Sequence, residues 1–435
     1  MWRTTVSVGV AVLMAGAMTS TTSAAPAAQP PEPASEPGFY EPPQKLPPGE
    51  NGDVVRSEPS PIAFALPGNH GQLPANATRM MYRSRDTHGK PTAVTGTYFD
   101  PTTPWNGPGP RPLISLAPGT QGQGDGCAPS KLVNTPFTVE QPGGPMIEYE
   151  MLQVHALLAK GYAVVMTDYE GLGTPGTHTY VNRASEGHAV LDAARAARNL
   201  PGTQLPPDPR IGLWGYSQGG GAAAAAAELA EPYAPELDIR GTYSGAPPAD
   251  LRATLKQADG GTLTGALGYT LNSMSAAYPE LRPRVQENVN DEGKKMLEAT
   301  SQQCVGATAL QFAFHRTDEY TADGRPLDDV LNDIPEAGPV LEDNKLGNRR
   351  PTAPALVVSG SADDVVPHGQ AKQLAEDWRA QGADVDWHAV PEPPIESLRT
   401  GLTHAVGEVP GLLDALNWMD QRFQDEPGAS DGEHS

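Results

Sequence analysis

The feature that most constrains this fold is an alternation of short apolar runs with amphipathic helical patterns between residues 93 and 423. The runs typical of strands cover residues 93–100, 112–119, 162–171, 210–217, 239–246, 354–364 and 384–390. The helical patterns cover residues 143–161, 184–200, 219–230, 369–382 and 410–423, and Ser185 is available to cap the second helix. Strands that alternate with helices form a mostly parallel sheet covered on both faces. The sequence therefore predicts an α/β fold with a mostly parallel central sheet.

Residues 250–348 interrupt this alternation, because they carry helical patterns without a convincing strand. We interpret them as a helical cap inserted into a core that comprises residues 57–249 and 349–423. Within the cap, Leu263–Tyr278 is rich in small and apolar residues. This segment is either an acyl-binding or lid surface or an ordinary part of the cap's own core.

The two ends of the chain differ in composition from the core. Residues 25–56 are rich in proline and predict an extended arm, and residues 424–435 are acidic and predict a disordered tail. In residues 1–24, Arg3 precedes an apolar run that ends in small residues, which is typical of a cleaved export signal. The apolar run is too short to span a bilayer, and we expect no other membrane segment. The alternative is that this run stays uncleaved as an N-terminal anchor.

The net charge of the chain limits the classes of partner that it can bind. The 30 basic and 52 acidic residues give a formal net charge of −22. Such a surface repels phosphate backbones, so nucleic-acid binding is not expected. We expect a secreted, soluble protein that is a monomer.

Cys127 and Cys304 are the two cysteines of the chain. In an oxidising compartment, a pair without competitors is most simply one disulfide. Two buried free thiols are the alternative. Two cysteines without a nearby histidine pair do not predict a metal site.

Ser217 lies between two glycines in "WGYSQGGGAAAAAAELA", after an apolar run and before an alanine-rich helical pattern. A strand–turn–helix corner holds a serine in a strained conformation, and side chains larger than glycine would clash beside it. The helix that follows directs its N–H groups and positive dipole end toward the place where an oxyanion would form. The pattern therefore predicts a nucleophilic serine, and a structural turn serine is the alternative.

A serine nucleophile needs a base and an acid that orients the base. In a chain with this succession of strands and helices, the acid follows the serine and the histidine follows the acid. We predict that His404 is the base because it stands in a glycine-bearing segment between the last strand and the last helix. His368 follows the aspartates too closely, His388 lies inside a strand, and His434 lies in the tail. The acid is Asp363 or Asp364, both at the end of a strand, and we prefer Asp363.

The glycine-rich segment "SLAPGTQGQGDGCAPS" follows a strand and requires a separate interpretation. It matches neither of the glycine patterns typical of phosphate or dinucleotide sites. In a hydrolase of this type, such a loop supplies a second oxyanion donor. We predict that the N–H groups of Thr120 and Gln218 are the donors, with Gln121 as the next choice after Thr120. A flexible surface loop is the alternative.

Five segments together resemble the secretory lipase family, which has actinobacterial and fungal members. These segments are "GTQGQGDGCAPS", the stretch from "GYAVVMTDYEG" to "AARNLP", "GYSQGGGAAAAAAELAEPYAPEL", "SGSADDVVP" and "GLTHAVGEVPG". The resemblance spans residues 57–423 and implies an α/β-hydrolase fold with a helical cap and a triad of Ser217, Asp363 and His404. It also implies that Cys127 is bridged to Cys304. "APGT" departs from the family, in which a histidine or another polar residue is expected before the glycine, and this leaves the oxyanion donor open.

The predicted function is a secreted serine ester hydrolase of lipase or esterase type, which acts on an ester or lipid substrate without a cofactor. A polyester hydrolase, a peptidase and an acyltransferase use the same triad. The non-enzyme alternative is an exported binding protein on an inactive hydrolase fold.

Overall fold

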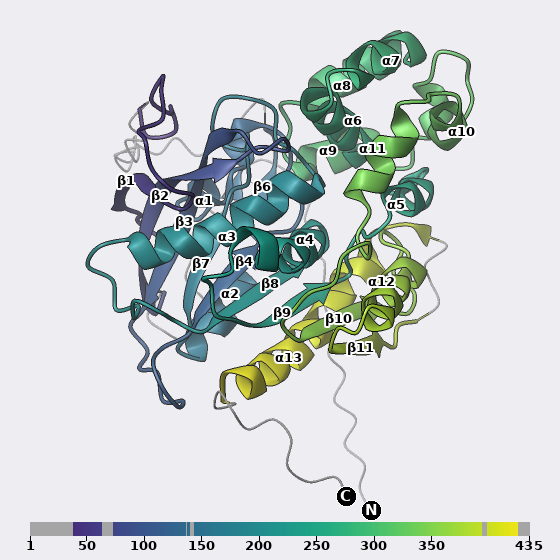
Figure 1. Cartoon of the computed structure of the whole chain (residues 1–435). Coiled ribbons are helices and arrows are strands. Elements are labelled where there is room, and N and C mark those ends of the chain that lie inside the picture. Colours follow the sequence, from purple (N-terminus) through teal and green to yellow (C-terminus); the bar gives the residue numbers. More distant parts are fainter. Residues whose placement is uncertain (1–37, 63–72, 136, 140–142, 394–397, 425–435) are drawn as a thin grey trace, which may run out of the picture. The chain divides into compact units, whose positions relative to one another are not determined.

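The computed structural model describes residues 38–62, 73–135, 137–139, 143–393 and 398–424, and Figure 1 labels its elements. The predicted export signal and all but the first residue of the predicted acidic tail therefore lie outside the described residues. The strands are β1 (Val54–Pro59), β2 (Ala75–Arg85), β3 (Pro91–Pro101), β4 (Leu113–Ala117), β5 (Phe137–Thr138), β6 (Met146–Ile147), β7 (Ala163–Thr167), β8 (Ile211–Tyr216), β9 (Ile239–Gly245), β10 (Ala355–Gly360) and β11 (Val385–Val390).

The main sheet has the strand order β1-β2-β3-β7-β4-β8-β9-β10-β11. Strands β1, β2, β3 and β7 pair antiparallel in turn, and every pair from β7 to β11 is parallel. The predicted mostly parallel sheet is confirmed. Strands β1 and β2 were not predicted from the sequence, and β1 begins at Val54, three residues before the expected core boundary at residue 57. The sequence of β1, "VVRSEP", combines charge and proline on an edge strand, so it lacks the apolar run by which the other strands were found.

The helices and 3₁₀ turns of the described residues are η1 (Asp125–Cys127), α1 (Pro129–Leu132), α2 (Met151–Ala159), α3 (Arg183–Asn199), α4 (Gln218–Tyr233), α5 (Leu251–Ala258), α6 (Ala266–Ala277), α7 (Leu281–Asn288), α8 (Asp291–Thr300), α9 (Val305–Phe312), η2 (Thr317–Glu319), α10 (Leu327–Asn332), α11 (Ala337–Asn344), α12 (His368–Ala380) and α13 (Leu402–Gln424). Helices α3, α4 and α12 cover one face of the sheet, and α2 and α13 cover the other. The alanines of α4 are buried, so this helix lies close to the strands. The result is a three-layer α/β/α core.

Three predicted helix boundaries are wrong. Helix α2 begins at Met151 rather than residue 143, because Gly144 has a positive φ of 75° and Met146 enters a short strand pair. Asn182, not Ser185, caps α3, and its side-chain oxygen accepts the N–H of Ser185 at 3.1 Å. Helix α13 begins at Leu402 and includes Pro410, which was expected to start it.

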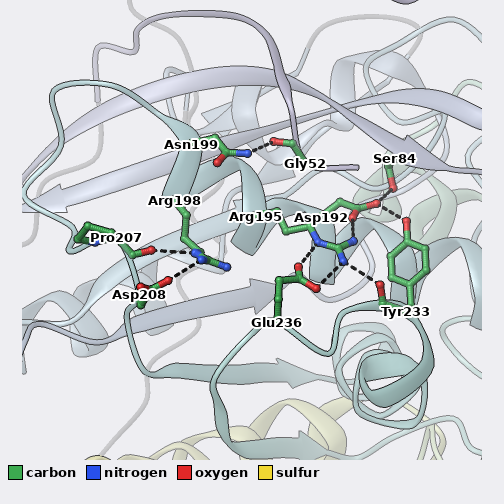
Figure 2. Close-up of polar contacts among 10 residues, drawn as sticks. All are labelled: Gly52, Ser84, Asp192, Arg195, Arg198, Asn199, Pro207, Asp208, Tyr233 and Glu236. Carbon is green, nitrogen blue, oxygen red and sulfur yellow. Dashed lines mark hydrogen bonds and ion pairs between the residues drawn. The ribbon is translucent and has the colours of Figure 1, made fainter. Parts of the chain in front are cut away.

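A buried ionic cluster fixes α3 against α4 and β2 (Figure 2). The carboxylate of Asp192 accepts the hydroxyls of Ser84 at 2.8 Å and Tyr233 at 2.7 Å and pairs with Arg195 at 2.8 Å. Arg195 also pairs with Glu236 at 2.6 Å. Burial raises the pKa of Asp192 to about 6, so the hydrogen bonds and the ion pair with Arg195 offset only part of the desolvation of this carboxylate. We regard this cluster as structural.

The region between β9 and β10 contains helices α5–α11, drawn in green in Figure 1, and contributes no strand to the main sheet among the described residues. Its core is formed by side chains of α5, α6, α10 and α11 that pack on one another. The N–H of Arg183 at the start of α3 donates to Asn344 of α11 at 3.0 Å, which ties this region to the sheet layers. The helical character predicted for residues 250–348 agrees with these elements, and their role as a cap stays a prediction.

Candidate active site

Ser217 stands at the sharp corner between β8 and α4. Its backbone has φ 59° and ψ −124°, a conformation that a residue with a side chain rarely adopts. A Cβ added at Gly215 would lie 2.1 Å from the carbonyl oxygen of Gly219. One at Gly219 would lie 2.0 Å from the carbonyl oxygen of Ala117, and one at Gly220 would lie 2.0 Å from backbone as well. The glycines are therefore required by the turn and by the close approach of α4 to the sheet.

The structure brings Ser217, His404 and Asp363 into one hydrogen-bonded row. Nε2 of His404 lies 2.9 Å from Oγ of Ser217, and Nδ1 lies 2.8 Å from Oδ2 of Asp363. Oδ1 of Asp363 accepts the N–H groups of Val365 at 2.9 Å and Val366 at 2.8 Å. These bonds hold the carboxylate in one orientation directly after β10.

Asp364 has a different place. Its carboxylate accepts the backbone N–H of Gly401 at 2.8 Å and that of His404 at 3.2 Å, so it caps the start of α13. His404 consequently lies in the first turn of α13, not in the loop that the sequence suggested. Among the other histidines considered, His368 begins α12, and His388 is an exposed strand residue 3.5 Å from Asp414. His434 lies outside the described residues.

The electrostatic surroundings of His404 favour its protonated form. Burial lowers the pKa of this imidazole, but the charge and hydrogen bond of Asp363 raise it, and Glu408 and Asp364 add to this effect. The net pKa lies above the usual value for histidine. Such a histidine can accept a proton from a hydroxyl at 2.9 Å and is stabilised once it is charged.

A cavity with about 1060 Å³ of empty space, its open mouth included, meets this row of side chains. Ser217, Gln218 and Thr120 line one end of it. The remaining lining is mostly apolar and comes from the helical region, with Leu251, Leu255, Leu263, Leu267, Leu271, Met274, Leu281, Val285, Leu327, Leu331, Ile334, Val340 and Leu341. Part of the predicted Leu263–Tyr278 segment thus lines the cavity.

The structure places both residues predicted to hold an oxyanion, Gln218 and Thr120, in the lining of the cavity together with Ser217. Gln218 is the first residue of α4, so its N–H has no acceptor inside the helix. Two tyrosines hold Thr120 in place. Its backbone carbonyl accepts the hydroxyl of Tyr149 at 2.7 Å, and its side-chain hydroxyl lies 2.9 Å from that of Tyr180. Both residues line the cavity with Ser217, and the role of their N–H groups as oxyanion donors stays a prediction.

Comparison with known proteins identifies the family. The sequence matches the Secretory lipase family over residues 139–431, which is more than half of the chain. The chain belongs to the secretory lipase family. A Mycobacterium tuberculosis protein called a probable inactive lipase is 33% identical over 357 residues, with 81% of this chain and 76% of that protein covered. Lipase 2 of Candida albicans is 28% identical over 413 residues, with 90% and 81% covered.

Solved structures show the same fold. Candida antarctica lipase A in its closed state superposes with a TM-score of 0.72 at 24% identity, and 92% of this chain and 89% of that chain are covered. The rice cell wall degrading esterase LipA from Xanthomonas oryzae has a TM-score of 0.69 at 21% identity, with 86% and 100% covered. The fold of this chain is that of an α/β-hydrolase.

The structure adds a buried acidic network that the sequence did not reveal. Glu150 accepts the N–H of Gly119, next to Thr120, at 2.6 Å. Nε2 of Gln153 donates to Glu150 at 2.7 Å and to Glu408 at 3.1 Å, one turn after His404. Burial raises the pKa of Glu150 well above its usual value, and burial also raises the pKa of Glu408. The network therefore joins the loop of Thr120 to the helix of His404.

A second missed group holds the Gln218 side chain. Nε2 of Gln218 lies 2.7 Å from Glu186 of α3 and 3.1 Å from Nε2 of His178. Burial raises the pKa of Glu186 to about 8 and lowers that of His178 to about 4. In the sequence, Glu186 and His178 stand near apolar residues, which suggests that they are buried. Nothing near them indicates that Gln218 is their shared partner.

Cys127 and Cys304 form a disulfide in this structure. The bond joins the segment after the Thr120 loop to the start of α9, across 177 residues of sequence, and both cysteines are buried. It links the helical region to the loop that supplies one predicted oxyanion donor. Among the described residues, no group of histidine, cysteine and carboxylate side chains could hold a metal ion, and no helix is long and apolar enough to cross a membrane.

Proposed function

We propose that this chain is a secreted serine carboxylic-ester hydrolase of lipase or esterase type. The observation that carries the proposal is the hydrogen-bonded row of Ser217, His404 and Asp363 at one end of an apolar cavity. Membership in the secretory lipase family supports the reaction class and export. The chemistry uses side chains and backbone N–H groups and calls for no cofactor.

Each residue has a role in a two-step acyl transfer. His404 takes the hydroxyl proton of Ser217 as Oγ attacks the ester carbonyl, and Asp363 stabilises the imidazolium. The N–H groups of Gln218 and Thr120 stabilise the oxyanion of the tetrahedral intermediate. The alcohol then leaves with the proton from His404, and a water activated by the same histidine releases the acid from the acyl-enzyme.

The cavity favours substrates with an aliphatic acyl group, because its lining away from Ser217 is mostly apolar. Burial of each additional CH₂ contributes about 0.8 kcal/mol, or up to about fourfold in kcat/KM when the transition state retains the contact. We therefore expect kcat/KM to rise from acetate toward longer p-nitrophenyl esters until the cavity is filled. A flat series would contradict the assignment of the cavity to the acyl group.

One observation supports the alternative of a binding protein without activity: the Mycobacterium tuberculosis relative is called a probable inactive lipase. A fluorophosphonate probe distinguishes the two possibilities, because only a serine activated by its histidine reacts rapidly with it. We expect the wild-type chain and Ser57→Ala, a change of an exposed serine on β1, to be labelled and to hydrolyse p-nitrophenyl esters. Ser217→Ala should do neither. An unlabelled wild-type protein, or equal turnover by Ser217→Ala, would overturn the proposed function.

A further inference from the structure

One segment of the chain contacts both sides of the proposed oxyanion site. It is the connection from β7 to α3 with the first turn of that helix, residues 168–186. The hydroxyl of Tyr169 donates to the carbonyl of Pro118 at 2.7 Å, and the hydroxyl of Tyr180 lies 2.9 Å from that of Thr120. These contacts hold the loop that carries Thr120. The same segment also holds the other predicted donor, Gln218, through its side chain.

Two acceptors of this segment fix the side chain of Gln218. Its Nε2 lies 2.7 Å from Oε1 of Glu186 and 3.1 Å from Nε2 of His178. Nδ1 of His178 lies 3.1 Å from the carbonyl oxygen of Glu170, which can only accept, so Nδ1 carries the proton and Nε2 accepts from Gln218. Burial lowers the pKa of His178 to about 4, which keeps this ring neutral. Both N–H bonds of the Gln218 amide are therefore used, and the side chain has one orientation.

Glu186 also holds a strained part of the cavity wall. Its Oε1 accepts the backbone N–H of Val181 at 2.8 Å. Val181 has a φ of 52°, in the left-handed region that a β-branched residue rarely adopts. Val181 lines the cavity together with Ser217 and Gln218. One carboxyl oxygen therefore fixes both the residue after the proposed nucleophile and the adjacent wall.

The turn at Ser217 needs support of this kind. Its φ of 59° is a strained conformation, which persists only where the surrounding structure holds it. Gln218 begins α4, and the N–H groups of a first helical turn have no acceptor inside the helix. A displacement of about 1 Å at a reacting group can lower a rate by about 10²-fold. A side chain that is anchored on α3 directly beside the turn therefore restricts the direction in which the N–H of Gln218 points.

We propose that Glu186 is a positioning residue for catalysis, which holds the Gln218 side chain so that the N–H groups of Gln218 and Thr120 meet the same oxyanion. This inference rests on the proposed function, because the oxyanion is that of the ester reaction. Glu186 acts through Gln218 and does not touch the substrate. Because residues 168–186 contact both donors, this one segment sets their relative placement.

The test compares variants of Glu186 with variants of Glu228. Glu228 is a matched control because it is a buried carboxyl farther along α4, where it accepts the N–H of Gly347 at 2.7 Å and the indole N–H of Trp378 at 3.0 Å. We expect Glu186→Leu to lower kcat on p-nitrophenyl butyrate by about 10- to 100-fold with little change in KM. Glu186→Gln keeps an acceptor oxygen and should keep kcat within about threefold. Glu228→Leu should lose stability and also keep kcat within about threefold.

A reversible inhibitor reports on the oxyanion itself. Oγ of Ser217 adds to the carbonyl carbon of octyl trifluoromethyl ketone, its proton passes to His404, and the carbonyl oxygen becomes the oxyanion. We expect the Ki of this ketone to rise in Glu186→Leu by the factor by which kcat falls, and to stay unchanged in Glu228→Leu. Gln218→Leu removes the same hydrogen bond from the other side. Its loss of kcat and that of Glu186→Leu should therefore not multiply in the double variant.

Three results would each overturn the positioning role: full kcat in Glu186→Leu, an equal loss of kcat in Glu228→Leu, or losses that multiply in the double variant. Circular dichroism verifies that each variant folds. If Glu186→Leu does not fold, Gln218→Leu decides, and full kcat in that variant would overturn the inference. A wild-type chain that neither hydrolyses soluble esters nor binds the ketone would contradict the proposed function, and the positioning role would fall with it.

Discussion

Replacing Asp363 by asparagine tests the triad at Oδ2, the atom that faces Nδ1 of His404. Oδ1 of Asp363 accepts two backbone N–H groups, at 2.9 and 2.8 Å, and Oδ2 lies 2.8 Å from Nδ1 of His404. Asparagine has one acceptor oxygen and one NH₂ donor. Because the two backbone donors need an acceptor, the amide oxygen takes the Oδ1 position. The NH₂ group then points at Nδ1 of His404.

This exchange reverses the proton positions on the imidazole. An NH₂ donor facing Nδ1 favours the tautomer that carries its proton on Nε2, the atom 2.9 Å from Oγ of Ser217. A protonated Nε2 cannot accept the serine proton, and the charge that stabilises the imidazolium is also lost. We expect kcat to fall by about 10⁴-fold, which corresponds to about 5 kcal/mol of transition-state stabilisation.

The assay is steady-state hydrolysis of a soluble p-nitrophenyl ester by Asp363→Asn and by its neighbour variant Asp364→Asn. The two carboxylate oxygens of Asp364 accept different backbone N–H groups at the start of α13, and asparagine keeps one acceptor oxygen. Its variant should therefore lose about 1 kcal/mol of stability and keep kcat within about tenfold. If Asp363→Asn keeps more than about a tenth of the wild-type kcat, or if Asp364→Asn is the more damaged variant, the tautomer argument is refuted.

Three further predictions follow from contacts of the site. Glu150→Ala should lower kcat on soluble esters by about 10- to 100-fold with little change in KM, because the loop of Thr120 loses the carboxylate that accepts the N–H of Gly119. Glu150→Gln should keep most of the activity. Equal losses of kcat in the two variants would contradict a positioning role for Glu150. The charge of Glu408 raises the pKa of His404, and activity falls as this base is protonated. Glu408→Gln should therefore move the acidic limb of the pH–kcat/KM profile to lower pH. An acidic limb at the same pH in both proteins would contradict this coupling. Cys127→Ser/Cys304→Ser should lower the free energy of unfolding by about 5 kcal/mol, as expected for a disulfide that joins residues 177 positions apart. Urea titrations measure this loss. An unchanged urea midpoint would show that the chain between the two positions is constrained in other ways.

Local signals in the sequence were sufficient for part of the site. The corner at Ser217 was predictable because its steric demands are met by glycines within four positions and by an adjoining strand and helix. The position of the acid after the end of a strand indicated Asp363 or Asp364, and β10 ends at Gly360; the contact of Asp363 with His404 separates the two. In both cases the local signal lies within a few residues of the group itself.

The rest of the site depends on contacts that no local pattern records. Gln153 and Glu408 are 255 positions apart, and nothing near either residue indicates the other. The start of α13 was misplaced for the same reason, because its cap is supplied by Asp364 rather than by a residue just before the helix. A proline at position 410 was the stronger local signal for a helix start, but it lies inside α13.

Helix α13 shows why periodicity alone cannot distinguish a buried apolar face from an exposed one. Its buried face includes Leu412, Leu416 and Met419, and its exposed stripe has the same spacing and the same residue types. A pattern of apolar positions gives the number of apolar faces on a helix, but it does not say which of them has a neighbour. Here the sheet covers one face, which also carries His404, and no described residue covers the other along residues 402–413. The second stripe, Leu402, Val406, Val409 and Leu413, keeps 50% to 57% of each residue exposed, so it contributes less to the stability of the fold than the buried face does.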